Sequence, residues 1–282
     1  MRSNEYLIEL RDVCVYFTER VGLLGKRVTK ALDHVNLSIS DGDVIAVVGE
    51  SGAGKTTMGR VILGLQKPTS GIALFRGKDI YSLKGREFEE FRRSVQWVPQ
   101  DPYSSLDPSL TIGEQLMAPI RRWNPKIDAS ARAQELLRLV GLVPPSFYMN
   151  KYPHQLSGGQ RQRIAIARSL ASNPRLIVAD EPVTMIDSSL RISFINTFIE
   201  LMRVVNLSLV FITHDIALAR ILLLKSGKGR VVILKDGRIV EEGDINEIVS
   251  NPRDEYTKVL VNAAPDLKKW LKGYEKRSEP SL

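Results

Sequence analysis

The sequence has a single cysteine, no long apolar run and no apolar leader, and each absence excludes a class of protein. Cys14 is alone among 282 residues, so no internal disulfide can form, and its apolar surroundings predict a small core residue. No run approaches the ~20 apolar residues that span a bilayer. Met1-Arg2-Ser3-Asn4-Glu5 lacks the apolar core of a signal peptide. We therefore expect a cytoplasmic protein without a membrane span of its own.

The composition is that of an ordinary soluble globular protein. Hydrophobic residues make up 43% of the chain and charged residues 26%, and the formal net charge is +8. A positive net charge favours binding to nucleic acid or to an anionic membrane surface. The charges are spread along the chain, however, with only a mild cluster near its end, and there is no internal repeat or low-complexity segment. We expect a soluble basic surface and no nucleic-acid partner.

Hydrophobic patterning near the N-terminus predicts strands connected by polar segments. Alternating apolar residues indicate strands over 6–17 and 31–39, and residues 18–30 read as a basic loop between them. Asp41-Gly42 is a hairpin turn signal.

Beyond this region, short apolar strands alternate with helical patterns, which indicates an α/β protein with a mostly parallel sheet. The segments 44–48, 176–179 and 209–212 are wholly apolar, as is typical of strands buried in such a sheet. Residues 101–153 contain many prolines and helical patterns and predict a mainly helical insertion.

A glycine-rich loop lies between an apolar strand and an apolar-periodic helix. Its sequence is Gly49-Glu50-Ser51-Gly52-Ala53-Gly54-Lys55-Thr56-Thr57. Glycines let backbone N–H groups turn inward around a phosphate, and the helix N-terminus behind the loop adds an anion site. Lys55 supplies a charge for the terminal phosphates, and the Thr56 hydroxyl can bind Mg²⁺. This loop predicts a bound nucleotide.

Two carboxylates follow the apolar strand over 176–179. The carboxyl ends of strands are where α/β sheets place their ligands. Asp180 suits a magnesium contact through water, and Glu181 suits a general base or a positioner of the attacking water.

A second anion-binding helix end is predicted at Leu156-Ser157-Gly158-Gly159-Gln160. Ser157 and Gln160 have the spacing of a capping box, and the two glycines leave backbone N–H groups open. One subunit needs only one phosphate loop. A second helix end that faces phosphate therefore suggests an ATP shared between two subunits.

With these motifs in place, residues 6–265 resemble the ATP-binding subunits of ABC transporters. Residues 50–57 are similar to the Walker A motif, 156–160 to the signature motif and 176–181 to Walker B. The resemblance also assigns roles to single residues: Gln100 to the glutamine that senses Mg²⁺, His214 to the switch histidine at the γ-phosphate, Asp187 to the D-loop aspartate, and Phe17, beside Tyr16, to the aromatic that stacks on adenine.

The resemblance implies a P-loop NTPase-type, mostly parallel sheet with an N-terminal antiparallel β subdomain. Residues 1–250 would form the nucleotide-binding domain, with a helical subdomain inserted at about 101–155, and 251–282 a short C-terminal extension. Two such subunits would enclose two ATP molecules head to tail and drive two transmembrane permease subunits. The chain would then be peripheral, on the cytoplasmic face of the cell membrane.

Narrower similarities indicate the dipeptide/oligopeptide importer ATPases. They lie in residues 100–108, 152–155 and 251–260, and the loop with Gly22-Leu23-Leu24 resembles the second ATPase of their heterodimers. Such importers also use an extracellular substrate-binding protein. Oligosaccharides are an alternative substrate, because the ATPase does not touch the cargo, and a soluble ABC ATPase acting on nucleic acid or ribosomes is a further alternative. The D-loop Thr184-Met185-Ile186-Asp187 departs from the usual Ser-Ala-Leu-Asp.

Overall fold

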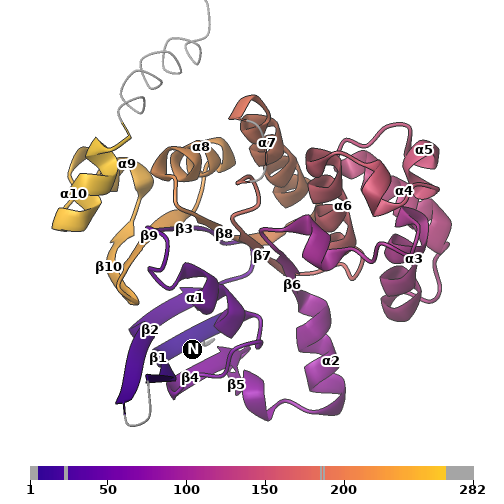
Figure 1. Ribbon diagram of the computed structural model, residues 1–282. Helices are drawn as coiled ribbons and strands as arrows, with labels where there is room; N and C mark the ends of the chain where they lie inside the picture. The colour runs from indigo at the N-terminus through magenta and orange to yellow at the C-terminus, as the bar shows by residue number, and fades with distance from the viewer. Residues whose placement is uncertain (1–5, 22–24, 185, 187, 265–282) are drawn as a thin grey trace, which may run out of the picture.

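The computed structural model describes residues 6–21, 25–184, 186 and 188–264. Within these residues, two β-sheets lie on opposite sides of helix α1 (Lys55–Ile62), and larger helices cover the far face of the larger sheet (Figure 1).

The larger sheet has six strands in the order β10-β9-β3-β8-β7-β6. All neighbours pair in parallel except β10, which pairs with β9 as an antiparallel edge hairpin. Strands β3, β7 and β8 are buried at every position, which explains their continuous apolar sequences. The strands are β3 (Val44–Val48), β6 (Val95–Val98), β7 (Leu176–Asp180), β8 (Ser208–Thr213), β9 (Arg230–Lys235) and β10 (Arg238–Gly243).

The smaller sheet is antiparallel and has the order β2-β1-β4-β5. Its strands are β1 (Ile8–Val21), β2 (Gly25–Ile39), β4 (Ser70–Phe75) and β5 (Lys78–Asp79). Apolar residues from one face of this sheet form a core with α1 and the near face of the larger sheet. Cys14 is buried in the smaller sheet, as its apolar surroundings predicted.

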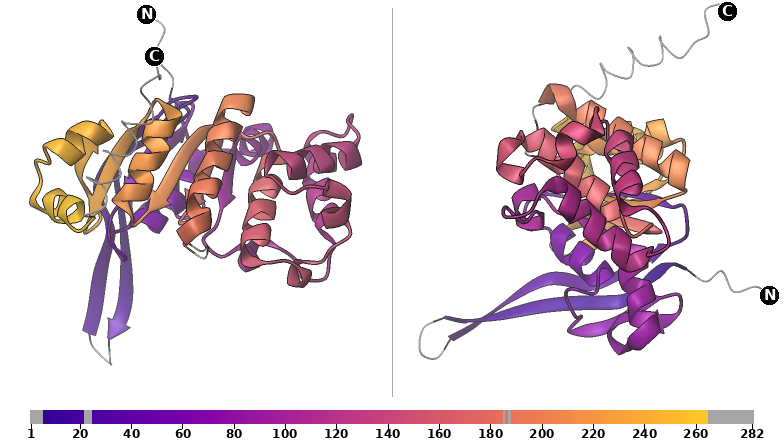
Figure 2. Two further views of the ribbon diagram at one scale, coloured as in Figure 1. Left: turned by 90° about the horizontal axis from the view of Figure 1, so that it is seen from above. Right: turned by 90° about the vertical axis from the view of Figure 1, so that its right-hand side faces the viewer.

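The expected basic loop is wrong for residues 18–21 and 25–30, whereas Gly22-Leu23-Leu24 lies outside the described residues. Strands β1 and β2 stay paired as far as Val21 and Gly25 and form a ribbon that projects from the body of the molecule (Figure 2). Glu19 lies opposite Arg27, and cross-strand pairs of opposite charge stabilise a ribbon. Charged residues are compatible with strands where neither face is buried, so their presence misled the prediction.

The turn at Asp41-Gly42 is present, but it does not form a hairpin. Its flanking strands, β2 and β3, belong to different sheets, so the turn carries the chain from the smaller sheet to the larger one. Gly42 has a φ of 81°, which suits glycine.

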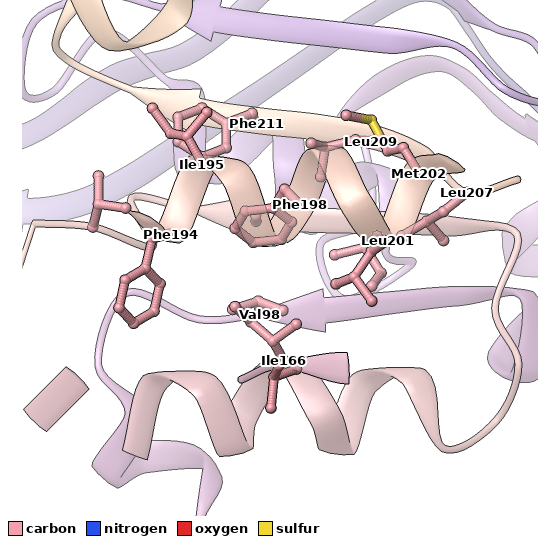
Figure 3. Close-up of a cluster of buried hydrophobic side chains, with 14 of the residues drawn as sticks. Val98, Ile166, Phe194, Ile195, Phe198, Leu201, Met202, Leu207, Leu209 and Phe211 are labelled. Carbon is pink, nitrogen blue, oxygen red and sulfur yellow. The ribbon is translucent and has the colours of Figure 1, made fainter. Parts of the chain in front are cut away.

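Helices α6 (Gly158–Leu170), α7 (Ser188–Val205) and α8 (Ile216–Ser226) belong to a second core over the far face of the larger sheet. Figure 3 shows buried side chains of α7, including Ile195 and Phe198, and Ile195 lies beside Phe211 of β8. The rings of Phe198 and Phe211 meet edge to face, with centroids 6.0 Å apart.

The chain between β6 and α6 is helical, in agreement with the expected insertion. It contains α3 (Ile112–Trp123), α4 (Ala129–Leu139) and α5 (Pro145–Met149), with 3₁₀ turns η2 (Pro102–Ser105) and η3 (Pro153–Gln155) at its ends. Asp128 caps α4 by accepting hydrogen bonds from the N–H groups of Ser130 and Ala131.

The remaining helical elements are η1 (Ile80–Ser82), α2 (Gly85–Ser94), α9 (Ile245–Ser250) and α10 (Glu255–Asn262). Helices α9 and α10 lie beyond the β10 edge of the larger sheet (Figure 1). Among the residues that the structure describes, no helix has the length and apolar character needed to cross a membrane.

Candidate active site

The glycine-rich loop connects β3 to α1 at the carboxyl end of the parallel strands. Gly54 has a φ of 102°, and a Cβ atom there would lie 2.1 Å from the carbonyl oxygen of Ala31. A Cβ atom at Gly49 would lie 2.2 Å from the carbonyl oxygen of Leu234. The backbone N–H of Gly237 also donates to the Ala53 carbonyl at 3.0 Å. The loop therefore needs glycine because β2 and β9 press directly against its backbone.

Lys55 lies inside the curve of this loop. Its ammonium donates to the carbonyl oxygens of Gly49 at 2.8 Å and Glu50 at 2.9 Å, and it lies 3.8 Å from a carboxylate oxygen of Glu181. The residue is only 5% exposed, and this burial lowers the pKa of the ammonium. Its positive charge is thus held where phosphates are expected.

Thr56 and Asp180 provide oxygen atoms beside each other. The Thr56 hydroxyl donates to Asp180 Oδ1 at 3.2 Å, and Asp180 is 4% exposed. Burial raises the pKa of this carboxyl group. A nearby divalent cation would favour the ionised form, and Mg²⁺ prefers carboxylate and hydroxyl oxygens. The donor set therefore fits Mg²⁺.

Three distant segments and a residue of its own turn converge on Glu181. Its Oε2 accepts hydrogen bonds from Thr184 Oγ1 at 2.9 Å and Gln100 Nε2 at 3.4 Å, and it lies 3.2 Å from His214 Nδ1. Lys55 approaches its other oxygen. These partners orient the carboxylate, as a general base requires.

The backbone of Glu181 is also unusual. It has a φ of 44°, uncommon for a residue other than glycine, and its N–H donates to the Ile212 carbonyl at 3.0 Å. Backbone conformations of this kind concentrate at functional sites.

Thr184 is a contact that the motif reasoning did not assign. The sequence signal was available, because a threonine three residues after an acid can reach back across a turn, and the Thr184 N–H does donate to the Glu181 carbonyl at 3.2 Å. Asp187 and Met185 of the same D-loop lie outside the described residues.

The Tyr16 side chain is hydrogen-bonded within the protein, whereas the Phe17 ring is exposed. The Tyr16 hydroxyl donates to Asp33 Oδ1 at 2.6 Å, and Arg238 also bonds Asp33. Phe17 is 41% exposed on β1. An exposed apolar ring is the better candidate for stacking on a base.

The predicted second anion site is built as a capped helix end. Ser157 Oγ accepts from the Gln160 N–H at 3.3 Å, and Gln160 Oε1 accepts from the Ser157 N–H at 3.0 Å. Around Gly159, a Cβ atom would meet only Phe194, at 3.9 Å. Within the described part of the chain, no hydrogen bond joins residues 157–160 to the loop at 49–57.

The parallel sheet, the glycine-rich loop between β3 and α1, and the acidic pair that follows β7 together define the class of phosphate-loop ATPases. Comparison with known proteins agrees. The model of the ABC transporter family matches residues 32–184. The oligopeptide transport ATP-binding protein OppF of Salmonella typhimurium is 39% identical over 272 residues, covering 94% of this chain and 79% of that protein. AppF of Bacillus subtilis, also an oligopeptide transport ATP-binding protein, is 39% identical over 272 residues, covering 95% and 80%.

Among solved structures, an ATP-binding cassette captured as a dimer after hydrolysis, with ADP and Pi, is 32% identical. The match has a TM-score of 0.72 and covers 84% of this chain and 98% of that one. The chain belongs to the ABC transporter family, and it binds ATP and couples its hydrolysis to transport. The family resemblance of the sequence motifs is confirmed.

Proposed function

We propose that this chain is the ATP-hydrolysing subunit of an importer for oligopeptides. The convergence of Lys55, Gln100, Thr184 and His214 on the Glu181 carboxylate carries the hydrolytic part of the proposal. The names of the relatives OppF and AppF support oligopeptides as the cargo.

In the proposed reaction, Glu181 accepts a proton from the water that attacks the γ-phosphate. Lys55 leaves the Gly49 and Glu50 carbonyls and pairs with the terminal phosphates, which stabilises their charge. His214, which contacts the same carboxylate, would also contact the γ-phosphate. Thr56 and Asp180, together with Gln100, would hold Mg²⁺, which neutralises phosphate charge when bound.

We further propose that ATP is shared with a second, homologous ATPase subunit. The capped helix end at Ser157 and Gly159 makes no hydrogen bond to the phosphate loop of its own chain, so its open N–H groups are available to a nucleotide held by another subunit. Asp187 would belong to the same contact. The related cassette solved as a dimer supports this arrangement, and a heterodimer agrees with the importer type.

A groove beside Gln100 is the proposed docking site for one of the two permease subunits. It has a volume of about 340 Å³ and is open to the surface. Its lining combines residues just before and after Gln100 with residues of α3 and α6, namely Trp97, Pro99, Ser104, Ser105, Pro119 and Arg168. A permease helix seated there would press on the segment attached to Gln100, at the cytoplasmic face of the membrane. An extracellular binding protein would deliver the peptide.

Exchange of Glu181 for glutamine tests the hydrolytic role. The E181Q variant should still bind ATP but lose hydrolysis by ~10²–10⁴-fold, the usual contribution of a general base. Glu200→Gln, on the exposed face of α7, is the matched control and should hydrolyse normally. Near-normal phosphate release from E181Q would refute the role given to Glu181. Peptide uptake with the permeases present would test the cargo.

A further inference from the structure

Helix α10 contacts the phosphate loop through one hydroxyl group. The backbone N–H of Glu50 donates to Tyr256 Oη at 2.7 Å, although the two residues are 206 positions apart in the chain. Glu50 belongs to the loop proper, directly after Gly49. A residue near the end of the described chain is thus bonded to the backbone that encloses the phosphates.

The position of this hydroxyl is set by several contacts. The two oxygens of Glu241 in β10 accept from the N–H groups of Arg253 at 3.0 Å and Asp254 at 3.2 Å. Asp254 then caps α10 by accepting from the Tyr256 N–H at 2.9 Å. The Tyr256 ring lies 5.0 Å from the Lys235 ammonium. Helix α10 is therefore anchored to the β9–β10 hairpin, which places the Tyr256 hydroxyl beside the loop.

The two backbone groups of Glu50 have different partners. Its N–H donates to Tyr256 Oη, and its carbonyl accepts the Lys55 ammonium at 2.9 Å. The bond to Tyr256 therefore does not depend on Lys55, and it would persist if Lys55 paired with phosphates. The bond from Gly237 N–H to the Ala53 carbonyl restrains the same loop from the same hairpin.

We propose that Tyr256 is a positioning residue for nucleotide binding, which holds the phosphate loop in its binding conformation through the backbone N–H of Glu50. The inference rests on the proposed ATP site and concerns affinity rather than the chemical step. A loop held in advance loses less conformational freedom on binding, so both ATP and ADP should bind more tightly than without Tyr256. Burial raises the pKa of the phenol, so its proton is retained at neutral pH.

The test is Tyr256→Phe, which keeps the ring over Lys235 and removes only the hydroxyl. Equilibrium binding of Mg-ATP and of ADP to the full chain should weaken by about 3–10-fold, the size expected for one hydrogen bond. The rate of hydrolysis at saturating ATP should stay unchanged. Tyr81→Phe is the matched control: the Tyr81 hydroxyl also bonds the backbone, at the Gln66 carbonyl, and its loss should leave nucleotide affinity unchanged.

Two further measurements separate positioning from a general structural effect. Hydrogen exchange of the peptide containing Glu50 should accelerate in Tyr256→Phe and not in Tyr81→Phe. Glu241→Gln, which loosens the anchor of α10, should weaken binding in the wild-type background but add little in the Tyr256→Phe background, since coupled residues are not additive.

The results distinguish the two proposals. Equal affinity and equal exchange in Tyr256→Phe and wild type would overturn the role of Tyr256 and leave the ATP site intact. Failure of the wild-type chain itself to bind ATP would instead refute the proposed function. If Tyr256→Phe does not fold, Glu241→Gln and Lys235→Met provide the test instead, because both should affect nucleotide affinity through Tyr256. Fully additive effects of these two substitutions on nucleotide affinity would overturn the inference.

Discussion

Gly54→Ala should destabilise the protein far more than Gly52→Ala, although both glycines lie in one loop and both have positive φ. The φ values are 102° at Gly54 and 86° at Gly52. A left-handed backbone costs an L-residue about 1–2 kcal/mol in either case. The surroundings differ, because a Cβ atom at Gly54 would lie 2.1 Å from the Ala31 carbonyl oxygen, whereas nothing lies within 4 Å of one at Gly52.

The steric overlap at Gly54 can be relieved only by moving backbone. The Ala31 carbonyl belongs to β2, and the Asp33 N–H and the Ala53 carbonyl are both bonded to Gly237, so three segments must shift together. Overpacking of this kind costs typically ~1–3 kcal/mol. Alanine also lowers the entropy of the unfolded chain, but this gain is equal at both positions and cancels in their difference. Gly54→Ala should therefore be less stable than Gly52→Ala by about 1–3 kcal/mol.

Thermal unfolding of the full chain without nucleotide, followed by circular dichroism, measures this difference. In a protein of this size, a loss of 1 kcal/mol in stability lowers the melting midpoint by about 2–4 °C. Gly54→Ala should therefore melt ~2–12 °C below Gly52→Ala. Gly227→Ala is a control away from the loop, with a φ of 67° and open space around it, and it should behave like Gly52→Ala. Equal midpoints for all three variants would show that contact with β2 does not constrain the loop, and would refute this reasoning.

Two other predictions concern the acidic pair. Thr184→Val removes the hydroxyl that donates to Glu181 at 2.9 Å. Steady-state ATPase assays should show kcat reduced about tenfold or more with ATP affinity unchanged, and Thr184→Ser should be near normal. Loss of ATP affinity instead of kcat would contradict a role of Thr184 in orienting Glu181. The raised pKa of Asp180 means that this group favours folding at low pH, and that its contribution is lost as pH rises from the unfolded pKa through the folded one. At neutral pH the buried carboxylate is therefore destabilising, and Asp180→Asn should raise the Tm of the metal-free protein while abolishing Mg²⁺-dependent hydrolysis; an unchanged or lower Tm at pH 7 would argue against this sign.

Much of the site was predictable because its parts are local patterns. A phosphate loop needs its glycines, Lys55 and Thr56 at fixed spacing, and a strand that ends in Asp180 and Glu181 places both acids at the sheet edge where ligands lie. The capping box at Ser157 and Gln160 likewise involves only residues three apart. Alternating apolar segments indicated the α/β architecture for the same reason: each strand or helix has its own period.

Contacts between distant segments could not be read in this way. In the β1–β2 ribbon, the side chains of residues 17–19 and 27–30 are exposed, so these segments lack the apolar pattern that marks a strand. Asp41-Gly42 encodes a turn, but whether the strands on either side pair depends on the sheets to which they belong.

The same division runs through the active site. Residue spacing along the chain was enough to identify the phosphate loop, the acid pair and the capped helix end, because neighbouring residues alone create them. The meeting of Gln100 and His214 on Glu181, and of Tyr256 on Glu50, exists only in the folded protein. Those contacts depend on how the parallel strands and the C-terminal helices pack, and packing is set by the whole core rather than by any one segment.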